Sequence, residues 1–114
     1  MKKKSNFDSD KYVINEKATV KEALLKVEDN HYGMILTKKN SGQIVGLATD
    51  GDIRRALLRG VTLDDSISNC VNNEFVWADA GSSREQLIKR LDSHIKYIPI
   101  LNKSNKLVSI ISRD

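Results

Sequence analysis

The sequence predicts an α+β fold in which two pseudo-symmetric β-α-β-β-α repeats form one compact module. Shifting the chain by 63 positions, the separation of Glu22 from Glu85, aligns residues 19–51 with residues 82–114 without a gap. A chain of 114 residues with 39% hydrophobic content can build a single core but not two independent domains. The identical pairs are Glu22 and Glu85, Leu24 and Leu87, Lys26 and Lys89, Asp29 and Asp92, His31 and His94, Ile35 and Ile98, Ser41 and Ser104, and Val45 and Val108.

Each repeat opens with a strand and a helix. Residues 12–14 and 75–77 are short β-prone runs. Thr19 with Glu22, and Ser82 with Glu85, have the capping-box spacing that starts a helix. Both helices should end near a histidine, His31 or His94, because an imidazolium interacts favourably with a helix C-terminus. The apolar residues at helical spacing are Val20, Ala23, Leu24 and Val27 in the first copy, and Leu87, Ile88 and Leu91 in the second.

A hairpin follows in each repeat. Residues 34–37 and 44–48 form the first pair of expected strands, and residues 97–101 and 107–111 form the second. Pro99 lacks a backbone donor, so we expect it at a strand start or at an edge. In the first repeat a second helix should begin at residues 49–52 and stop at Gly60. We expect it to bury Ile53, Ala56, Leu57 and Leu58 and to display Arg54, Arg55 and Arg59, while residues 63–67 could form one helical turn.

Composition narrows the cellular setting. The single cysteine, Cys70, cannot form an internal disulfide, which favours a reducing cytoplasm. The basic start is not followed by an apolar run, so it does not read as a signal peptide, and no stretch is long enough to span a bilayer. Residues 2–4 carry three of the net +4 charges without aromatic neighbours, which favours a solvated tail over a nucleic-acid-binding arm.

The repeated order of elements resembles a pair of CBS domains, also called a Bateman module. The pattern is carried by residues 46–52 in the first copy and by residues 97–101 and 106–114 in the second, and the resemblance spans Lys11 to the end. Residues 49–57 further resemble CBS modules attached to bacterial sugar nucleotidyltransferases and to arabinose-5-phosphate isomerases.

The resemblance implies a division of the chain into a leader (1–10), a first repeat (11–60), a linker (61–73) and a second repeat (74–114). The last lacks its final helix, because the counterpart of Asp52 would follow Asp114. We therefore expect an N-terminal part of a longer protein, which fits the nucleotidyltransferase arrangement better than the isomerase one.

In this family a Thr/Ser-x-x-Asp motif holds a nucleotide, which assigns the ribose to Asp52 and the phosphate to Thr49. Free N–H groups at a helix N-terminus suit phosphate. The resemblance implies binding roles for Asp50, Gly51, Arg54 and Arg55, with the base against Tyr32 and Met34 and with Ala18 and Thr19 closing one side. The alternative, which stays open, is that Thr49 and Asp52 only cap the helix. The weaker second site comprises Ser112, Arg113 and Tyr97.

Three functions remain in view. The first is a non-catalytic regulatory module that senses AMP, ADP or ATP, forms a homodimer through its helices and controls an attached catalytic domain. The second is a structural dimerisation module with a vestigial pocket. A catalytic fragment is the least favoured, because the sequence has no general-base, nucleophile or metal-ligand pattern; neither histidine has a partner at metal-ligand spacing. No cofactor is required.

Overall fold

The computed structural model describes residues 7–112 and confirms an α+β fold made of two similar repeats. Repeat 1 consists of the 3-10 helix η1 (Ser9–Tyr12), β1 (Val13–Asn15), α1 (Val20–Asn30), β2 (Met34–Lys38), β3 (Ile44–Thr49) and α2 (Asp50–Leu58). The 3-10 helix η2 (Ile67–Asn69) lies in the connection. Repeat 2 consists of β4 (Ala78–Asp79), α3 (Arg84–Arg90), β5 (Tyr97–Leu101) and β6 (Leu107–Ser112).

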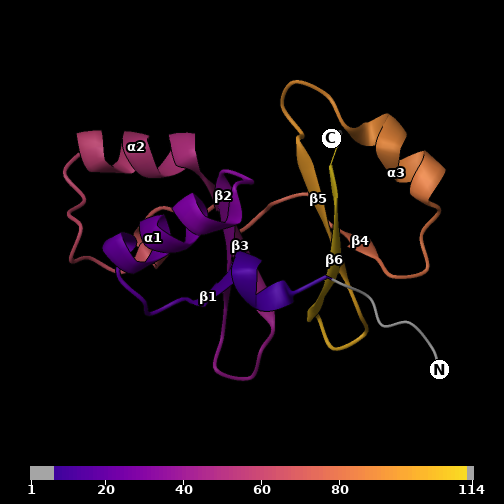
Figure 1. Ribbon diagram of the computed structural model, residues 1–114, viewed down its shortest axis with the longest axis horizontal. Helices are drawn as coiled ribbons and strands as arrows, with labels where there is room; N and C mark the ends of the chain where they lie inside the picture. The colour runs from indigo at the N-terminus through magenta and orange to yellow at the C-terminus, as the bar shows by residue number, and fades with distance from the viewer. Residues whose placement is uncertain (1–6, 113–114) are drawn as a thin grey trace.

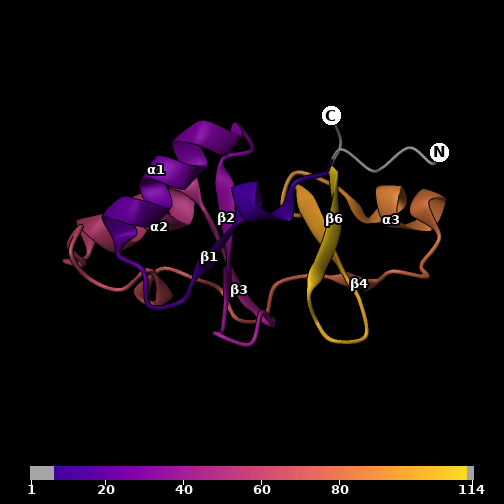
Figure 2. The same ribbon diagram turned by 60° about the horizontal axis from the view of Figure 1, so that its bottom comes forward.

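Each repeat forms its own three-stranded sheet with the same topology. The first strand pairs parallel to the second, and the second pairs antiparallel to the third, giving the orders β1-β2-β3 and β4-β5-β6. In Figure 1 the two sheets lie at the middle of the molecule, with α1 and α2 outside one sheet and α3 outside the other. The turned view in Figure 2 keeps this arrangement.

The buried side chains form three clusters that match this layering. One packs α1 and α2 on their sheet, and one packs α3 on the second sheet. The third lies between the sheets and joins Met34 and Leu36 of β2 to Leu101 of β5. Apolar burial of this kind is worth roughly 25 cal/mol per Å². The repeats are therefore joined sheet to sheet by an apolar layer, as the expected single compact module requires.

The helix starts confirm one predicted cap and correct the other. Thr19 caps α1 in a full capping box with Glu22, and His31 closes that helix in the left-handed conformation. In repeat 2 the predicted box of Ser82 and Glu85 is wrong, because Ser83 is the N-cap and accepts from the Gln86 amide. The helix α3 also ends at Arg90, so His94 lies in the following loop and not at the helix end.

Four further expectations need correction. The strand β4 begins at Ala78, beyond the predicted residues 75–77. Pro99 lies inside the central strand β5, where β4 pairs only with residues 100–101 and so requires no donor from the proline. Leu58, predicted to be buried, is 81% exposed because α2 directs only Ile53 and Ala56 fully inward. The turn predicted over residues 63–67 appears slightly later, as η2.

The connection between the repeats is hydrogen-bonded to repeat 1. Asn72 exchanges two backbone hydrogen bonds with Leu47 of β3, at 2.8 and 3.1 Å, and the Asn73 side chain donates to the Val45 carbonyl. Earlier in the connection, the Ile67 amide donates to the Ala18 carbonyl. These bonds hold Asn72 and Asn73 beside the middle of β3. The expected solvated tail, residues 2–4, lies outside the described residues.

Candidate functional site

A cavity of about 990 Å³ lies between the two repeats. This volume is at the upper end of the range of about 300–1,000 Å³ that small-molecule sites occupy. Its walls come from four segments: the turn before β2, the end of β3 with the start of α2, residues 72 and 74–76 of the connection, and residues 93–97 before and at the start of β5. Because both repeats contribute, the cavity exists only in the assembled pair.

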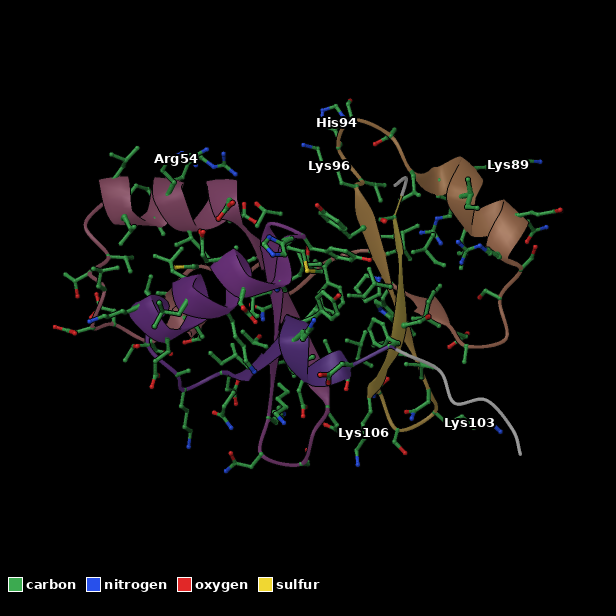
Figure 3. The ribbon with its side chains drawn as sticks, viewed as in Figure 1. Arg54, Lys89, His94, Lys96, Lys103 and Lys106 are labelled. Carbon is green, nitrogen blue, oxygen red and sulfur yellow. The ribbon has the colours of Figure 1, made fainter. Side chains whose placement is uncertain are left out.

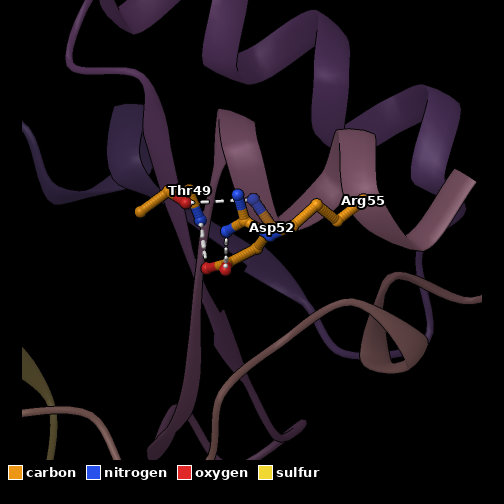
Figure 4. A network of polar contacts seen from close by, with 3 residues as sticks. All are labelled: Thr49, Asp52 and Arg55. Atoms are coloured by element: carbon orange, nitrogen blue, oxygen red, sulfur yellow. Dashed lines mark hydrogen bonds and ion pairs between the residues drawn. The ribbon is translucent and has the colours of Figure 1, made fainter. Parts of the chain in front are cut away.

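The start of α2 forms one wall and contains the predicted Thr49–Asp52 motif (Figure 4). The Thr49 hydroxyl accepts from the Asp52 amide at 3.1 Å, and Asp52 Oδ2 accepts from the Thr49 amide at 3.0 Å. Asp52 Oδ1 accepts from the Arg55 guanidinium at 2.9 Å. The motif therefore forms a capping box, as the alternative interpretation expects. The Asp52 carboxylate can still accept further hydrogen bonds, because a carboxylate has about four lone-pair sites and these contacts use two.

The aromatic side chains beside this wall come from both repeats. The rings of Tyr32 and Tyr97 stack at 5.6 Å between centroids with an interplanar angle of 19°, and the Tyr97 hydroxyl donates to the Tyr32 carbonyl. Both residues line the cavity, with Gly33 next to Tyr32. Stacked rings offer a flat apolar surface of the kind on which a planar base binds.

The opposite walls contain residues that the sequence analysis missed. Asn72, Glu74, Phe75 and Val76 line the cavity from the connection, and residues 93–96 line it from repeat 2. No motif marks either segment. The order of the elements offered the available indication. The connection must pass β3 to reach β4, so it could be expected to form a second wall of the cavity.

The structure brings together most of the predicted site. Tyr32, Thr49, Asp50, Gly51, Asp52, Arg54 and Arg55 all line the cavity, and so does Tyr97, which had been assigned to the second site. Three predicted residues are placed elsewhere. Met34 is fully buried in the layer between the sheets. Thr19 forms a bridge with Ser66, and Ala18 is bonded to Ile67, so both face the connection instead of the cavity.

The second predicted site is described only in part. Ser112 ends β6 and pairs with Tyr97. Arg113 lies outside the described residues.

A smaller cavity of about 200 Å³ adjoins the first and shares Asp52, Arg55 and Asn72 with it. It is closed by Arg59, Asn69 and Cys70 among others. Burial raises the pKa of the Cys70 thiol above its ordinary value, and the nearby Arg59 opposes that rise only partly. A thiol held protonated is a poor nucleophile and a poor metal ligand.

Residues 7–112 contain neither a metal-binding cluster nor a membrane-spanning helix. No group of three or more His, Cys, Asp or Glu side chains is arranged to hold a metal ion. No helix in this part of the chain is both long and apolar enough to cross a membrane.

Solved structures share this architecture. A CBS domain protein of Pyrobaculum aerophilum in complex with AMP matches 91% of this chain and 85% of its own, with a TM-score of 0.73 and 21% identity. The cytosolic domain of the Mg²⁺ channel MgtE in complex with ATP matches 90% of this chain and 42% of its own, with a TM-score of 0.73 and 16% identity. At these identities the likeness shows the fold.

Sequence relatives and the family model complete the comparison. An uncharacterized protein of Helicobacter pylori strain J99 is 30% identical over 57 residues, which are 50% of this chain and 17% of that protein. This chain spans a fifth or less of the length of the curated relatives it matches. The CBS domain model matches twice, over residues 7–59 and 66–114, which together make up most of the sequence. This chain therefore belongs to the CBS domain family and consists of a tandem pair of these domains.

Proposed function

We propose that this CBS pair is a non-catalytic regulatory module that binds an adenine nucleotide in the cavity between its repeats. The observation that carries the proposal is the position of Thr49 and Asp52, at the start of a nine-residue helix on the wall of a cavity of ligand size. CBS proteins of the same fold have been solved with AMP and with ATP.

Each part of a nucleotide finds a matching group. The unused lone pairs of Asp52 can accept hydrogen bonds from ribose hydroxyls, while the Thr49 hydroxyl and the positive end of α2 favour phosphate. Arg55 already holds the Asp52 carboxylate at 2.9 Å and so orients it. The stacked rings of Tyr32 and Tyr97 offer the base an apolar surface.

Regulation follows if the ligand binds two arrangements of the module unequally. A nucleotide here would contact α2 of repeat 1 and residues 93–97 of repeat 2, so it would favour one spacing of the repeats. The attached domain that receives the signal is, in this proposal, a sugar nucleotidyltransferase. The protein would act in the cytoplasm.

The module would associate with a second copy through its helices. Leu25 on α1 is 63% exposed and Leu58 on α2 is 81% exposed, so each helix presents an apolar side chain to the outside. Burying side chains of this size contributes roughly 1.5–3 kcal/mol each. These exposed leucines also support the second candidate function, a structural dimerisation module with a vestigial pocket. A sugar-phosphate isomerase is the alternative to the nucleotidyltransferase as the attached enzyme.

Thermal-shift and calorimetric titrations with AMP, ADP, ATP, CMP, GTP and S-adenosylmethionine separate the two functions, with size-exclusion chromatography run in parallel. The sensor requires saturable binding of at least one adenine nucleotide. A dimer that persists while none of the six compounds binds would reject the sensor and favour the structural module. A monomer that binds nucleotide would reject only the dimer.

A further inference from the structure

The opening of the cavity is flanked by cationic side chains from both repeats. Arg54 projects from the first turns of α2, and His94 and Lys96 lie on the loop before β5, across the opening (Figure 3). Arg54 and Lys96 are exposed, and neither forms an ion pair or side-chain hydrogen bond with another residue of the range 7–112. Both charges are therefore available to an anion.

The loop that carries Lys96 has a defined shape. Asp92 Oδ1 accepts from the amides of His94 and Ile95, each at 2.7 Å, and the Asp92 amide donates to the Ile95 carbonyl at 2.9 Å. The His94 ring is hydrogen-bonded to the Ser93 hydroxyl at 3.3 Å. A loop held by its own backbone bonds presents Lys96 without a large ordering cost on binding.

The charges on the cavity wall are divided between cations and acids. The acids are Asp50, Asp52 and Glu74, and Asp52 is already paired with Arg55. Among the described residues of the wall, two further cations, Arg54 and Lys96, are balanced by two acids that form no ion pair, Asp50 and Glu74. The cavity wall therefore has no net charge. A phosphate at the start of α2 would be close to Arg54 and Arg55, whereas Lys96 belongs to the other repeat. Only an anion that extends across the opening can use the cations of both walls.

We propose that the cavity selects nucleoside di- and triphosphates over monophosphates, with Lys96 of repeat 2 binding the terminal phosphates of a chain that begins at Thr49. This rests on the proposed function and adds the ligand class and the specificity residue. A longer phosphate chain would connect the two repeats, because α2 belongs to repeat 1 and Lys96 to repeat 2. The polyphosphate spans the opening between α2 and the loop, and the monophosphate leaves the opening unbridged.

The smaller cavity offers the phosphate chain a different route. It contains Arg59, but its other cation, Arg55, is held by Asp52. One unpaired cation beside a buried thiol is a weaker attraction than Arg54 and Lys96 together. The experiment includes Arg59→Ala so that this route is measured as well.

Calorimetry with AMP, ADP and ATP tests the proposal, at low salt and with EDTA so that free nucleotides are compared. The variants are Lys96→Ala, Arg59→Ala and, as a matched control, Lys89→Ala, which removes an equally exposed lysine from the outer helix α3 (Figure 3). We expect ATP to bind about 10-fold or more tightly than AMP, and Lys96→Ala to weaken ATP about 5- to 10-fold while AMP changes less than about 2-fold. Lys89→Ala and Arg59→Ala should match the parent.

The outcomes separate this inference from the proposed function. If AMP binds as tightly as ATP, or if Lys96→Ala weakens both equally, the polyphosphate preference is overturned while nucleotide sensing survives. If Arg59→Ala weakens ATP and Lys96→Ala does not, the assignment to Lys96 is overturned. If no nucleotide binds the parent protein, both proposals fall.

Discussion

Replacing Asp52 by alanine, beside the same change at Glu22, separates the capping role of Asp52 from its binding role. The two acids hold the same position in two capping boxes: each accepts from the amide of its N-cap threonine, at 3.0 Å for Asp52 and 2.9 Å for Glu22. Asp52 lines the large cavity, and Glu22 does not. Glu22→Ala is therefore a control for lost capping in the same molecule.

The stability loss can be worked out from the contacts. Losing the box costs about 1 kcal/mol at either helix. Asp52→Ala also removes the ion pair with Arg55, whose side chain is 61% exposed, so solvent limits that term to about 0.3–0.5 kcal/mol. At Asp52 the higher helix propensity of alanine returns roughly 0.5 kcal/mol, whereas at Glu22, where the original residue is already a good helix former, it returns less. We expect a net loss of about 1 kcal/mol for each variant, which lowers Tm by roughly 3–6 °C.

The two variants should have similar stabilities but different affinities for the nucleotide. Hydrogen bonds to a charged group are worth about 1.5–3 kcal/mol, so Asp52→Ala should weaken nucleotide binding roughly 10- to 100-fold. Glu22→Ala should leave the dissociation constant unchanged. Urea unfolding supplies the stabilities and calorimetry supplies the affinities. Equal affinities in the two variants would show that Asp52 is only a cap and would refute its assignment to the ribose.

Three further predictions concern packing and the buried thiol. Gly46→Ala should destabilise by about 1–3 kcal/mol in urea unfolding, because the new Cβ would lie 2.8 Å from Thr37 Oγ1 and 2.9 Å from Val71 Cγ2; Gly81→Ala, with no atom within 4 Å, is the control, and equal midpoints would contradict the close packing. Thr37→Val should stabilise by about 1 kcal/mol, because the Thr37 hydroxyl is buried and has no hydrogen-bond partner among the described residues; a lower unfolding midpoint would mean that the hydroxyl is bonded in solution. Cys70 should react with a maleimide far more slowly in the folded chain than in urea, because burial raises its thiol pKa. The unfolded thiol ionises first as pH rises through its ordinary value of 9.0, so the free energy of unfolding should fall above that range more in the parent than in Cys70→Ser, and parallel pH profiles would contradict this.

The sequence predicted correctly those features that depend on a single helix or strand. The repeat predicted two similar sheets, Thr19 starts α1 with the predicted capping box, and Thr49 caps α2 as the alternative interpretation of its motif expected. In repeat 2 the adjacent serines offer two N-caps one residue apart, and the chain uses Ser83. That choice is made by packing, since Leu87 must point into its core, and spacing alone does not reveal it.

The site could be predicted only for the wall that carries a motif. Thr49 and Asp52 are neighbours on one helix start, so their spacing in the sequence fixes their spacing in the fold. Lys96 and Glu74 reach the cavity because the two sheets pack face to face, and that contact depends on many weak apolar pairs far apart in the chain. Ala18 was assigned to the wrong surroundings for the same reason, since its partner Ile67 belongs to the connection.

The repeats are not equivalent at their shared boundary, and this argues for one nucleotide site in this part of the chain. By the offset of 63, the counterparts of cavity residues 72–76 are residues 9–13, which form η1 and the start of β1. There the Tyr12 ring packs against Tyr32 with centroids 4.9 Å apart and a tilt of 41°, and Tyr32 stacks on Tyr97 at 5.6 Å. Tyr97 is the cross-strand partner of Ser112, the counterpart of Thr49, so its side chain lies on the same face as that of Ser112. Aromatic packing thus lies beside Ser112, whereas Thr49 lines the large cavity. Replacing Tyr12 with a small residue would remove part of that packing, and a change from one to two bound nucleotides per chain would show that the aromatic residues keep the second site closed, whereas an unchanged stoichiometry would contradict it.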